Sequence, residues 1–187
     1  YYDPWTEGVV NDFAFNLAKV LVQQGFKIIS GFGLGIGSSI INGALDEIVN
    51  SKYKHIDEHL CLRPFPQTAQ AGKSLPDLWQ DYRIKMIGES GIAIFIFGNK
   101  IKKGEDKNTT VIADGMLKEF EIAKRNSAII IPIGSTGWAA QKIFKEVESE
   151  IDKYPYLSEY LDILRSCTDP NELIKTICAI VNKQQPY

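Results

Sequence analysis

The sequence predicts an α/β fold in which helices cover both faces of a doubly wound, mainly parallel sheet. Residues 92–97 (IAIFIF) and 128–133 (AIIIPI) are continuous apolar runs, without the polar alternation of a strand that has one wet face. Stretches with apolar residues at helical spacing lie between such runs. This alternation of buried strands and amphipathic helices is typical of parallel sheets whose strands are joined by crossover helices.

The elements are expected in a regular order along the chain. The first half predicts a helix over residues 6–24, a strand over 26–30, a helix over 38–50, a strand over 59–63, a helix over 74–89 and a strand over 92–97. The second half predicts a charged loop over 100–110, a helix over 111–125, a strand over 128–133, a helix from about residue 136 and two final helices. Ser74 and Asp169 are expected to cap the helices that follow them.

Composition limits the class of protein. The 187 residues, 44% hydrophobic with a formal net charge of −2, suit a single globular domain over residues 1–187. The charge argues against nucleic-acid binding, and the apolar runs are far shorter than the roughly 20 residues of a membrane helix. No signal peptide opens the chain, so we expect a cytoplasmic protein. Because a doubly wound sheet usually begins with a strand, we also expect a piece of a longer protein, cut after its first strand.

Cysteine and histidine usage gives no metal or disulfide signal. Cys61, Cys167 and Cys178 are odd in number and lack the spacing of metal ligands, so we expect reduced, partly buried thiols. His55 and His59 have no accompanying cysteine or second histidine pair, which favours solvated or capping roles. No metal site is predicted.

The segment FKIISGFGLGIGSSIIN, residues 26–42, reads as a strand, a glycine-rich loop and a helix. Gly31, Gly33, Gly35 and Gly37 alternate with other residues, and Ser38 is placed to cap the helix. Backbone amides at a helix N-terminus, beside a loop with few Cβ atoms, form a favourable site for phosphate. The alternative is that the glycines only allow a sharp turn.

That loop differs from the standard nucleotide-binding fingerprints. The spacing G-x-G-x-G-x-G is neither the G-x-G-x-x-G of dinucleotide-binding folds nor a loop ending in Gly-Lys-Ser/Thr, which excludes nucleoside triphosphate hydrolysis. In a dinucleotide-binding dehydrogenase the next strand ends in an acid that holds a ribose, whereas here it ends in Arg63. A guanidinium at this position favours a phosphorylated ligand. The alternative for Arg63 is a structural ion pair.

Four segments together resemble a known family. SGFGLGIG, LRPFPQ, YRIKMIGESGIAIFIFGNK and VIADGMLKEFEIAKRNSAIIIPIG resemble the SLOG superfamily of Rossmann-like proteins, from the first helix to about residue 150. More narrowly, they are similar to the C-terminal SLOG domains of sirtuin-like NADase effectors in bacterial Thoeris anti-phage defence.

The resemblance implies a sensor without catalytic residues, cofactor or metal of its own. Such a domain binds a cyclic ADP-ribose isomer made by a TIR-domain protein and thereby releases the NADase activity of an attached sirtuin-like domain in the bacterial cytoplasm. The partners expected are this small-molecule signal, the sirtuin-like domain of the same chain and further copies of the chain, as a homodimer within a tetramer, with no membrane or nucleic acid. The final helices are candidates for the subunit contact, or else they pack onto their own domain.

The expected ligand contacts are Gly31, Phe32, Gly33, Leu34, Gly35, Gly37, Ser38, Arg63, Phe65, Arg83, Lys85, Gly98, Asn99, Lys100, Asp114, Gly115 and Glu119. The glycine loop and the basic side chains would hold the pyrophosphate. The aromatic and apolar residues of the first segments would form a wall for adenine. Asp114 and Glu119 would bind ribose hydroxyls, or else they are only favourable charges at a helix N-terminus.

The main alternative is a LOG-type enzyme that hydrolyses nucleoside 5′-monophosphates at the N-glycosidic bond. This chain departs from that family's motifs, because Gly98, Asn99 and Lys100 replace its paired glycines and Tyr82 stands in place of its arginine. Arg83 follows one residue later, which rotates a helical side chain by about 100°. A third reading, a DprA-like nucleic-acid-binding module, conflicts with the net charge of −2.

Overall fold

The structure is a computed structural model that describes residues 1–33, 35–52, 54–69, 72–102 and 108–185. Its contacts divide the chain into two compact units. One consists of Glu7–Ser90, and the other combines Tyr1–Thr6 with Gly91–Tyr187. We call them the glycine-loop unit and the C-terminal unit and describe each in turn.

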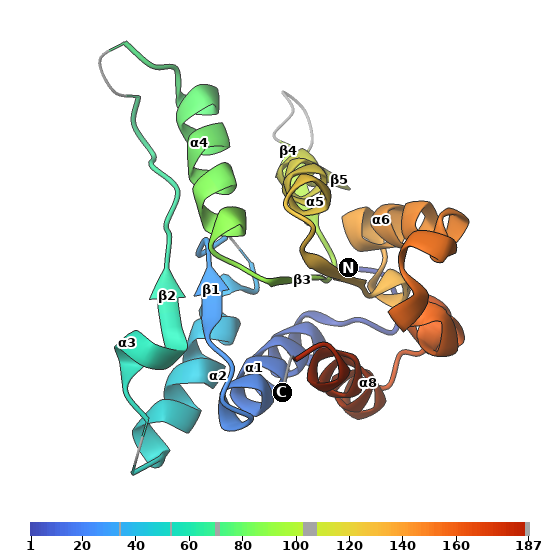
Figure 1. The fold of residues 1–187 in the computed structure, drawn as a ribbon. Helices are drawn as coiled ribbons and strands as arrows, with labels where there is room; N and C mark the ends of the chain where they lie inside the picture. Colours follow the sequence, from blue (N-terminus) through green and yellow to red (C-terminus); the bar gives the residue numbers. More distant parts are fainter. Residues whose placement is uncertain (34, 53, 70–71, 103–107, 186–187) are drawn as a thin grey trace. The chain divides into compact units, whose positions relative to one another are not determined.

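The glycine-loop unit contains two parallel strands and the helices around them (Figure 1). Its elements are α1 (Glu7–Gln23), β1 (Ile28–Ser30), α2 (Gly37–Asn50), α3 (Ile56–His59), β2 (Leu60–Leu62) and α4 (Leu75–Gly88). Ile29 of β1 lies opposite Cys61 of β2. The order strand, glycine loop, helix is thus confirmed for residues 28–50.

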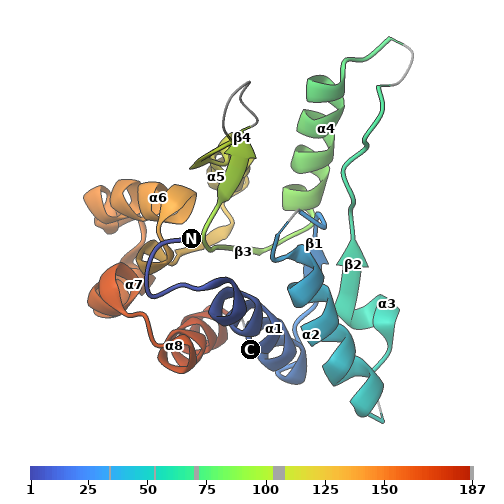
Figure 2. The same cartoon turned by 180° about the vertical axis from the view of Figure 1, so that it is seen from behind.

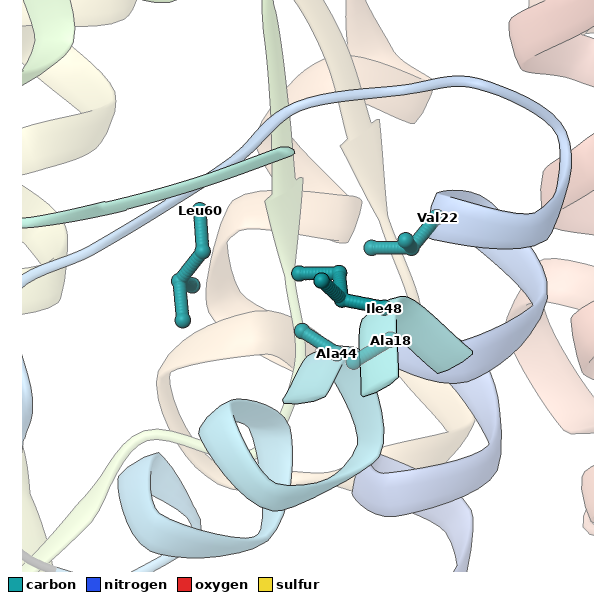
Figure 3. Close-up of a cluster of buried hydrophobic side chains, with 5 residues drawn as sticks. All are labelled: Ala18, Val22, Ala44, Ile48 and Leu60. Atoms are coloured by element: carbon teal, nitrogen blue, oxygen red, sulfur yellow. The ribbon is translucent and has the colours of Figure 1, made fainter. Parts of the chain in front are cut away.

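A small apolar core fixes α1 and α2 against this strand pair. It consists of Ala18, Val22, Ala44, Ile48 and Leu60, all buried (Figure 3). The two helices approach so closely that a Cβ added at Gly43 would lie 2.0 Å from the carbonyl oxygen of Phe15. A glycine is therefore required in the middle of α2, although glycine is a poor helix former.

The C-terminal unit contains a parallel strand pair, an antiparallel hairpin and a helical C-terminal part. Its strands are β3 (Ile92–Phe95), β4 (Asn99–Lys102), β5 (Thr109–Ile112) and β6 (Ile129–Pro132). Its helices are α5 (Asp114–Arg125), α6 (Trp138–Ser149), α7 (Leu161–Ser166) and α8 (Pro170–Lys183), with 3₁₀ turns at Gly134–Thr136, Ile151–Lys153 and Pro155–Tyr160. Ile94 of β3 lies opposite Ile131 of β6, in parallel.

The predicted fold class is confirmed. Parallel strand pairs with surrounding helices form a Rossmann-like α/β fold. Two of the predicted caps are also confirmed, since the Ser74 side chain accepts the amide of Asp77 and the Asp169 side chain accepts the amides of Asn171 and Glu172.

The prediction of a charged loop over 100–110 followed by a helix from 111 was wrong. Asn99–Lys102 and Thr109–Ile112 pair as an antiparallel hairpin, in which Ile101 lies opposite Thr110. The reason is the β-branched run Thr109 to Ile112, which favours a strand. The helix begins at Asp114 instead. Residues 103–107 of this segment lie outside the described residues.

Two further predictions needed correction. Ser38 does not cap α2, because this helix begins at Gly37 and its N-cap position is Ile36, which makes no side-chain capping bond. The predicted strand over 59–63 is shorter, because His59 ends the short helix α3.

Apolar side chains of the C-terminal elements are buried within the chain. Leu157, Leu164 and Ile177 are fully buried inside the chain itself. Packing onto their own domain, the alternative left open by the sequence, is therefore what the structure shows for these residues. No helix within the described residues has both the length and the apolar character needed to span a membrane.

Candidate functional site

The predicted ligand contacts fall into two groups, one in each unit. The first group lies in the glycine-loop unit, in the loop between β1 and α2, at the end of β2 and on α4. The second follows β3 and continues into the hairpin and α5. Leu34, one of the predicted contacts, lies outside the described residues.

Three of the four loop glycines have a structural reason. A Cβ at Gly31 would lie 2.6 Å from Cε2 of Phe65, and a Cβ at Gly37 would lie 3.2 Å from the carbonyl carbon of Phe32. Gly35 has a φ of 100°, which residues with a side chain rarely adopt. These three glycines are explained by packing and backbone geometry, as the alternative reading of the loop expected.

Gly33 differs from the other three. A Cβ at Gly33 would meet no atom of the described structure within 4 Å, and the residue is exposed. Its φ lies outside the left-handed region. Neither packing nor a left-handed backbone requires glycine here, and a main chain without a Cβ at this position is open to close approach from outside.

Phe32 is held in a strained conformation beside Gly33. Its φ is 51°, and its side chain is 54% exposed. The backbone amide of Phe32 donates to Oγ of Ser30 at 3.2 Å, which helps to fix the turn. A large apolar side chain in the left-handed region is an outlier of the kind that gathers at binding sites.

The ring of Phe65 is enclosed by residues of its own unit. The guanidinium carbon of Arg83 lies 5.1 Å from the ring centroid, and the ring of Tyr82 lies at 6.4 Å. The indole of Trp79 donates to the carbonyl of Pro66 at 2.7 Å, which ties this segment to α4. The structure thus brings Phe65 and Arg83 together, whereas Lys85 on the same helix is exposed to solvent.

Arg63 forms an ion pair. Its Nε and Nη2 atoms donate to Oε2 of Glu89 at 3.1 and 2.8 Å, and both side chains are about one-third exposed. The structural ion pair that the sequence left open is therefore present. Partial exposure leaves the guanidinium accessible to a second anion.

The second group begins at a tight turn after β3. Phe97 has a φ of 55°, and Gly98 follows with a φ of 90°. A Cβ at Gly98 would lie 2.5 Å from Sδ of Met116 and 2.6 Å from Cβ of Ala139, so this position requires glycine for two reasons. Asn99 then opens β4.

The side chains of Lys100 and Asp114 form an ion pair between β4 and the N-terminus of α5. Its hydrogen bond to Lys100 lowers the pKa of the Asp114 carboxyl. Gly115 and Glu119 lie in the first two turns of the same helix. Lys100 and Asp114 thus place one cation and one carboxylate at a helix N-terminus, a composition that suits ribose hydroxyls and phosphate, and Glu119 lies in the second turn.

Sequence reasoning missed the aromatic cluster formed by the N-terminal segment of the C-terminal unit. Tyr2 stacks on Trp138 with ring centroids 4.4 Å apart, and Trp5 meets Phe97 edge to face at 5.2 Å. Figure 2 shows this segment beside α6. The aromatic composition of YYDPW was the only local signal. In the described part of the chain, no three His, Cys, Asp or Glu residues cluster in a way that could hold a metal ion.

Comparison with known proteins gives consistent matches. The model of the STALD family, described as the Sir2- and TIR-associating SLOG family, matches residues 1–184. A protein named NAD(+) hydrolase ThsA from Acinetobacter baumannii (strain 532279) is 41% identical over 155 residues, covering 82% of this chain and 32% of the relative. Proteins of the same name from Cytobacillus dafuensis and Bacillus cereus (strain MSX-D12) are 44% and 39% identical, covering 76% and 82% of this chain and 28% and 30% of the relatives. The chain thus spans about a third of the length of these relatives or less.

Proposed function

The chain belongs to the Sir2- and TIR-associating SLOG family, and we propose that it is the nucleotide-sensing domain of a Thoeris defence protein that binds a cyclic ADP-ribose isomer. The observation that carries the proposal is Gly33, an exposed loop glycine that neither packing nor backbone conformation requires. It lies between a strand and the N-terminus of α2, where backbone amides favour an anion.

In the glycine-loop unit, we assign the pyrophosphate to the loop of Gly31, Gly33, Gly35, Gly37 and Ser38. The 14-residue helix α2 contributes its unpaired amides and the positive end of its dipole. Arg63 would release the carboxylate of Glu89 and bind a phosphate oxygen instead. Both are charge-assisted hydrogen bonds of similar strength, so the exchange costs little.

The aromatic residues of the same unit are assigned to the adenine base. Phe32 presents a largely exposed ring, and Phe65 is held in place by Arg83 and Gly31. Aromatic side chains stack on nucleobases with little dependence on which base is bound. Lys85 and Arg83 supply additional positive charge for the phosphates.

In the C-terminal unit, we assign the ribose hydroxyls to Asp114 and Glu119 and a phosphate contact to Lys100, with Gly98, Asn99 and Gly115 supplying main-chain groups. The ion pair between Lys100 and Asp114 supports this assignment, because it holds a donor and an acceptor together at a helix N-terminus.

Downstream, the ligand would act by shifting a population of quaternary states. A ligand changes such an equilibrium only if it binds one state better than another. We propose that the chain forms a homodimer within a tetramer in the bacterial cytoplasm, and that the output is the NADase activity of an attached sirtuin-like domain. In this proposal the chain itself performs no catalysis.

The proposal is tested by calorimetric titration of the chain with cyclic ADP-ribose isomers, with AMP and ADP-ribose as controls, followed by chromatography of the mixtures. We expect one cyclic isomer to bind and to be recovered intact. Release of free adenine from AMP would instead establish the LOG-type hydrolase, and the absence of binding by every isomer would contradict the sensor.

A further inference from the structure

Thr136 is a buried polar residue in the 3₁₀ turn that follows β6. Its side chain is only 2% exposed, and among the described residues Thr176 of α8 is the other buried polar residue. The amide of Phe97 donates to Oγ1 of Thr136 at 2.8 Å, and this hydroxyl donates to the carbonyl of Ile133 at 2.7 Å. A single hydroxyl therefore connects the chain after β3 with the chain after β6.

The segment that Thr136 holds is strained. Phe97 lies in the left-handed region with a φ of 55°, and Gly98 follows at 90°. Bulky residues adopt such a φ only where surrounding contacts impose it. Here the Phe97 carbonyl accepts the amide of Ala140 at 2.9 Å, and the Gly98 carbonyl accepts the amide of Ala113 at 2.8 Å.

This turn determines where the next residues begin. Gly98, Asn99 and Lys100 follow it directly, and Lys100 then pairs with Asp114. A change of φ at Phe97 would redirect the backbone that enters β4. The hydroxyl of Thr136 is thus placed to control the position of the second group of proposed ligand contacts without lying among them.

We propose that Thr136 is a positioning residue of the sensor, which fixes the turn at Phe97 and Gly98 so that residues 98–100 are preorganised for the ligand. The inference rests on the proposed function and deepens it. It also gives a role to the GSTGW segment, residues 134–138, which contains none of the proposed ligand contacts. Preorganisation strengthens binding because less conformational freedom is lost when the ligand is bound.

Three substitutions separate positioning from general stability. Thr136→Val keeps the shape but removes the acceptor for the amide of Phe97 and the donor for the carbonyl of Ile133. Thr136→Ser keeps the hydroxyl. Thr176→Val removes a hydroxyl of matched burial from α8 in the same unit and leaves the turn intact.

The test is calorimetric titration of the four proteins with the cyclic ADP-ribose isomer that the wild type binds, below the unfolding temperature of each. We expect Thr136→Val to bind about tenfold more weakly, and the other two variants to stay within about twofold of the wild type. Hydrogen exchange supplies a second measure, because the amide of Phe97 should exchange faster in Thr136→Val than in Thr136→Ser.

Two results would overturn the positioning role of Thr136 while leaving the proposed function intact. One is wild-type affinity in Thr136→Val, and the other is a loss of affinity in Thr176→Val as large as that in Thr136→Val. If Thr136→Val does not fold, Thr136→Cys replaces it, because a thiol is a weak acceptor. Its affinity should fall below that of Thr136→Ser, and equal affinities would overturn the inference. A wild type that binds no isomer would overturn the proposed function, and with it this inference.

Discussion

Arg63 and Glu89 join the end of β2 to the residue after α4, with two guanidinium nitrogens donating to one carboxylate oxygen at 3.1 and 2.8 Å. The side chain proposed to hold a phosphate therefore already has an anionic partner. Ligand binding at Arg63 must compete with this carboxylate, which reduces affinity unless the pair opens at little cost. Because both side chains are about one-third exposed, the ion pair contributes little free energy and opens at little cost.

The competition predicts opposite effects for the two partners. Glu89→Gln should increase affinity for the cyclic isomer by about threefold, because the guanidinium is released for the phosphate. Arg63→Glu should weaken binding by at least about tenfold, since it places a negative charge beside the pyrophosphate. Calorimetry on both folded variants measures the two effects. Undiminished binding by Arg63→Glu would rule out Arg63 as a phosphate contact.

Gly31 and Gly33 are expected to respond differently to the same substitution. Gly31→Ala places a Cβ 2.6 Å from the ring of Phe65 and should lower the free energy of unfolding by about 1–3 kcal/mol. Gly33→Ala meets open space and should change stability by less than about 0.5 kcal/mol. Its effect should appear as a loss of ligand affinity. Urea denaturation and calorimetry together distinguish the two, and a Gly33→Ala variant with unchanged affinity would remove the main support for the phosphate loop.

Helix packing in the glycine-loop unit gives a sharp stability test. Gly43→Ala should destabilise the protein by about 3 kcal/mol, because its Cβ would lie 2.0 Å from the backbone oxygen of Phe15 and the two helices must separate. Gly8→Ala in α1 is the matched control, since its Cβ meets nothing within 4 Å. This control should stabilise by about 0.5 kcal/mol through helix propensity. Equal unfolding midpoints for the two variants would contradict the close approach of α1 and α2.

The pair between Lys100 and Asp114 predicts a dependence on pH. The pKa of Asp114 is lowered in the folded state, so its contribution to stability is present above the unfolded pKa and disappears as pH falls through the folded pKa. Exposure of both side chains limits this contribution to less than about 1 kcal/mol. Asp114→Asn should therefore be slightly less stable than the wild type at neutral pH, and the difference should begin to shrink near the ordinary carboxyl pKa of about 4 and vanish below the lowered pKa of the folded state. A difference that grows in acid would contradict the pairing.

Tyr156 is expected to protect the edge of β6. Its hydroxyl accepts the amide of Ile130 at 2.9 Å and donates to the carbonyl of the same residue at 3.0 Å. Burial raises the pKa of this phenol, so it remains a donor at neutral pH. Tyr156→Phe should lose about 1–3 kcal/mol of unfolding free energy. Tyr154→Phe, on a ring 6.4 Å away, keeps both bonds and serves as the control in urea denaturation.

Features that depend on neighbouring residues could be predicted from the sequence. The caps at Ser74 and Asp169 are set by side chains that bond to amides two or three positions later, and both were identified. The strands at β3 and β6 were identified because a short, continuous apolar run is typical of a strand that is covered on both faces. The hairpin of β4 and β5 was missed. The lysines of β4 are typical of an exposed loop, so the sequence of β4 does not indicate that it pairs with the β-branched run of β5.

The site was only partly predictable for the same reason. The glycine loop is a local pattern and was found. Nothing in the loop itself indicates that Gly31 must lack a Cβ because the ring of Phe65 packs against it. The partner of Arg63 lies 26 residues away, and the hydroxyl that holds Phe97 lies 39 residues away. Such contacts depend on the path of the backbone, so periodicity and spacing do not reveal them.

Trp5 is buried at 3% exposure, and its indole nitrogen donates to the carbonyl of Ser135, 130 positions further along the chain. Translation proceeds from the N-terminus, so the first six residues are made well before the unit to which they belong. Residues 7–90 form the other compact unit, which is synthesised in full much earlier and can fold first. During synthesis the indole of Trp5 therefore stays exposed until β6 and the turn after it leave the ribosome. Nascent chains paused before residue 135 should therefore be the forms most dependent on chaperones.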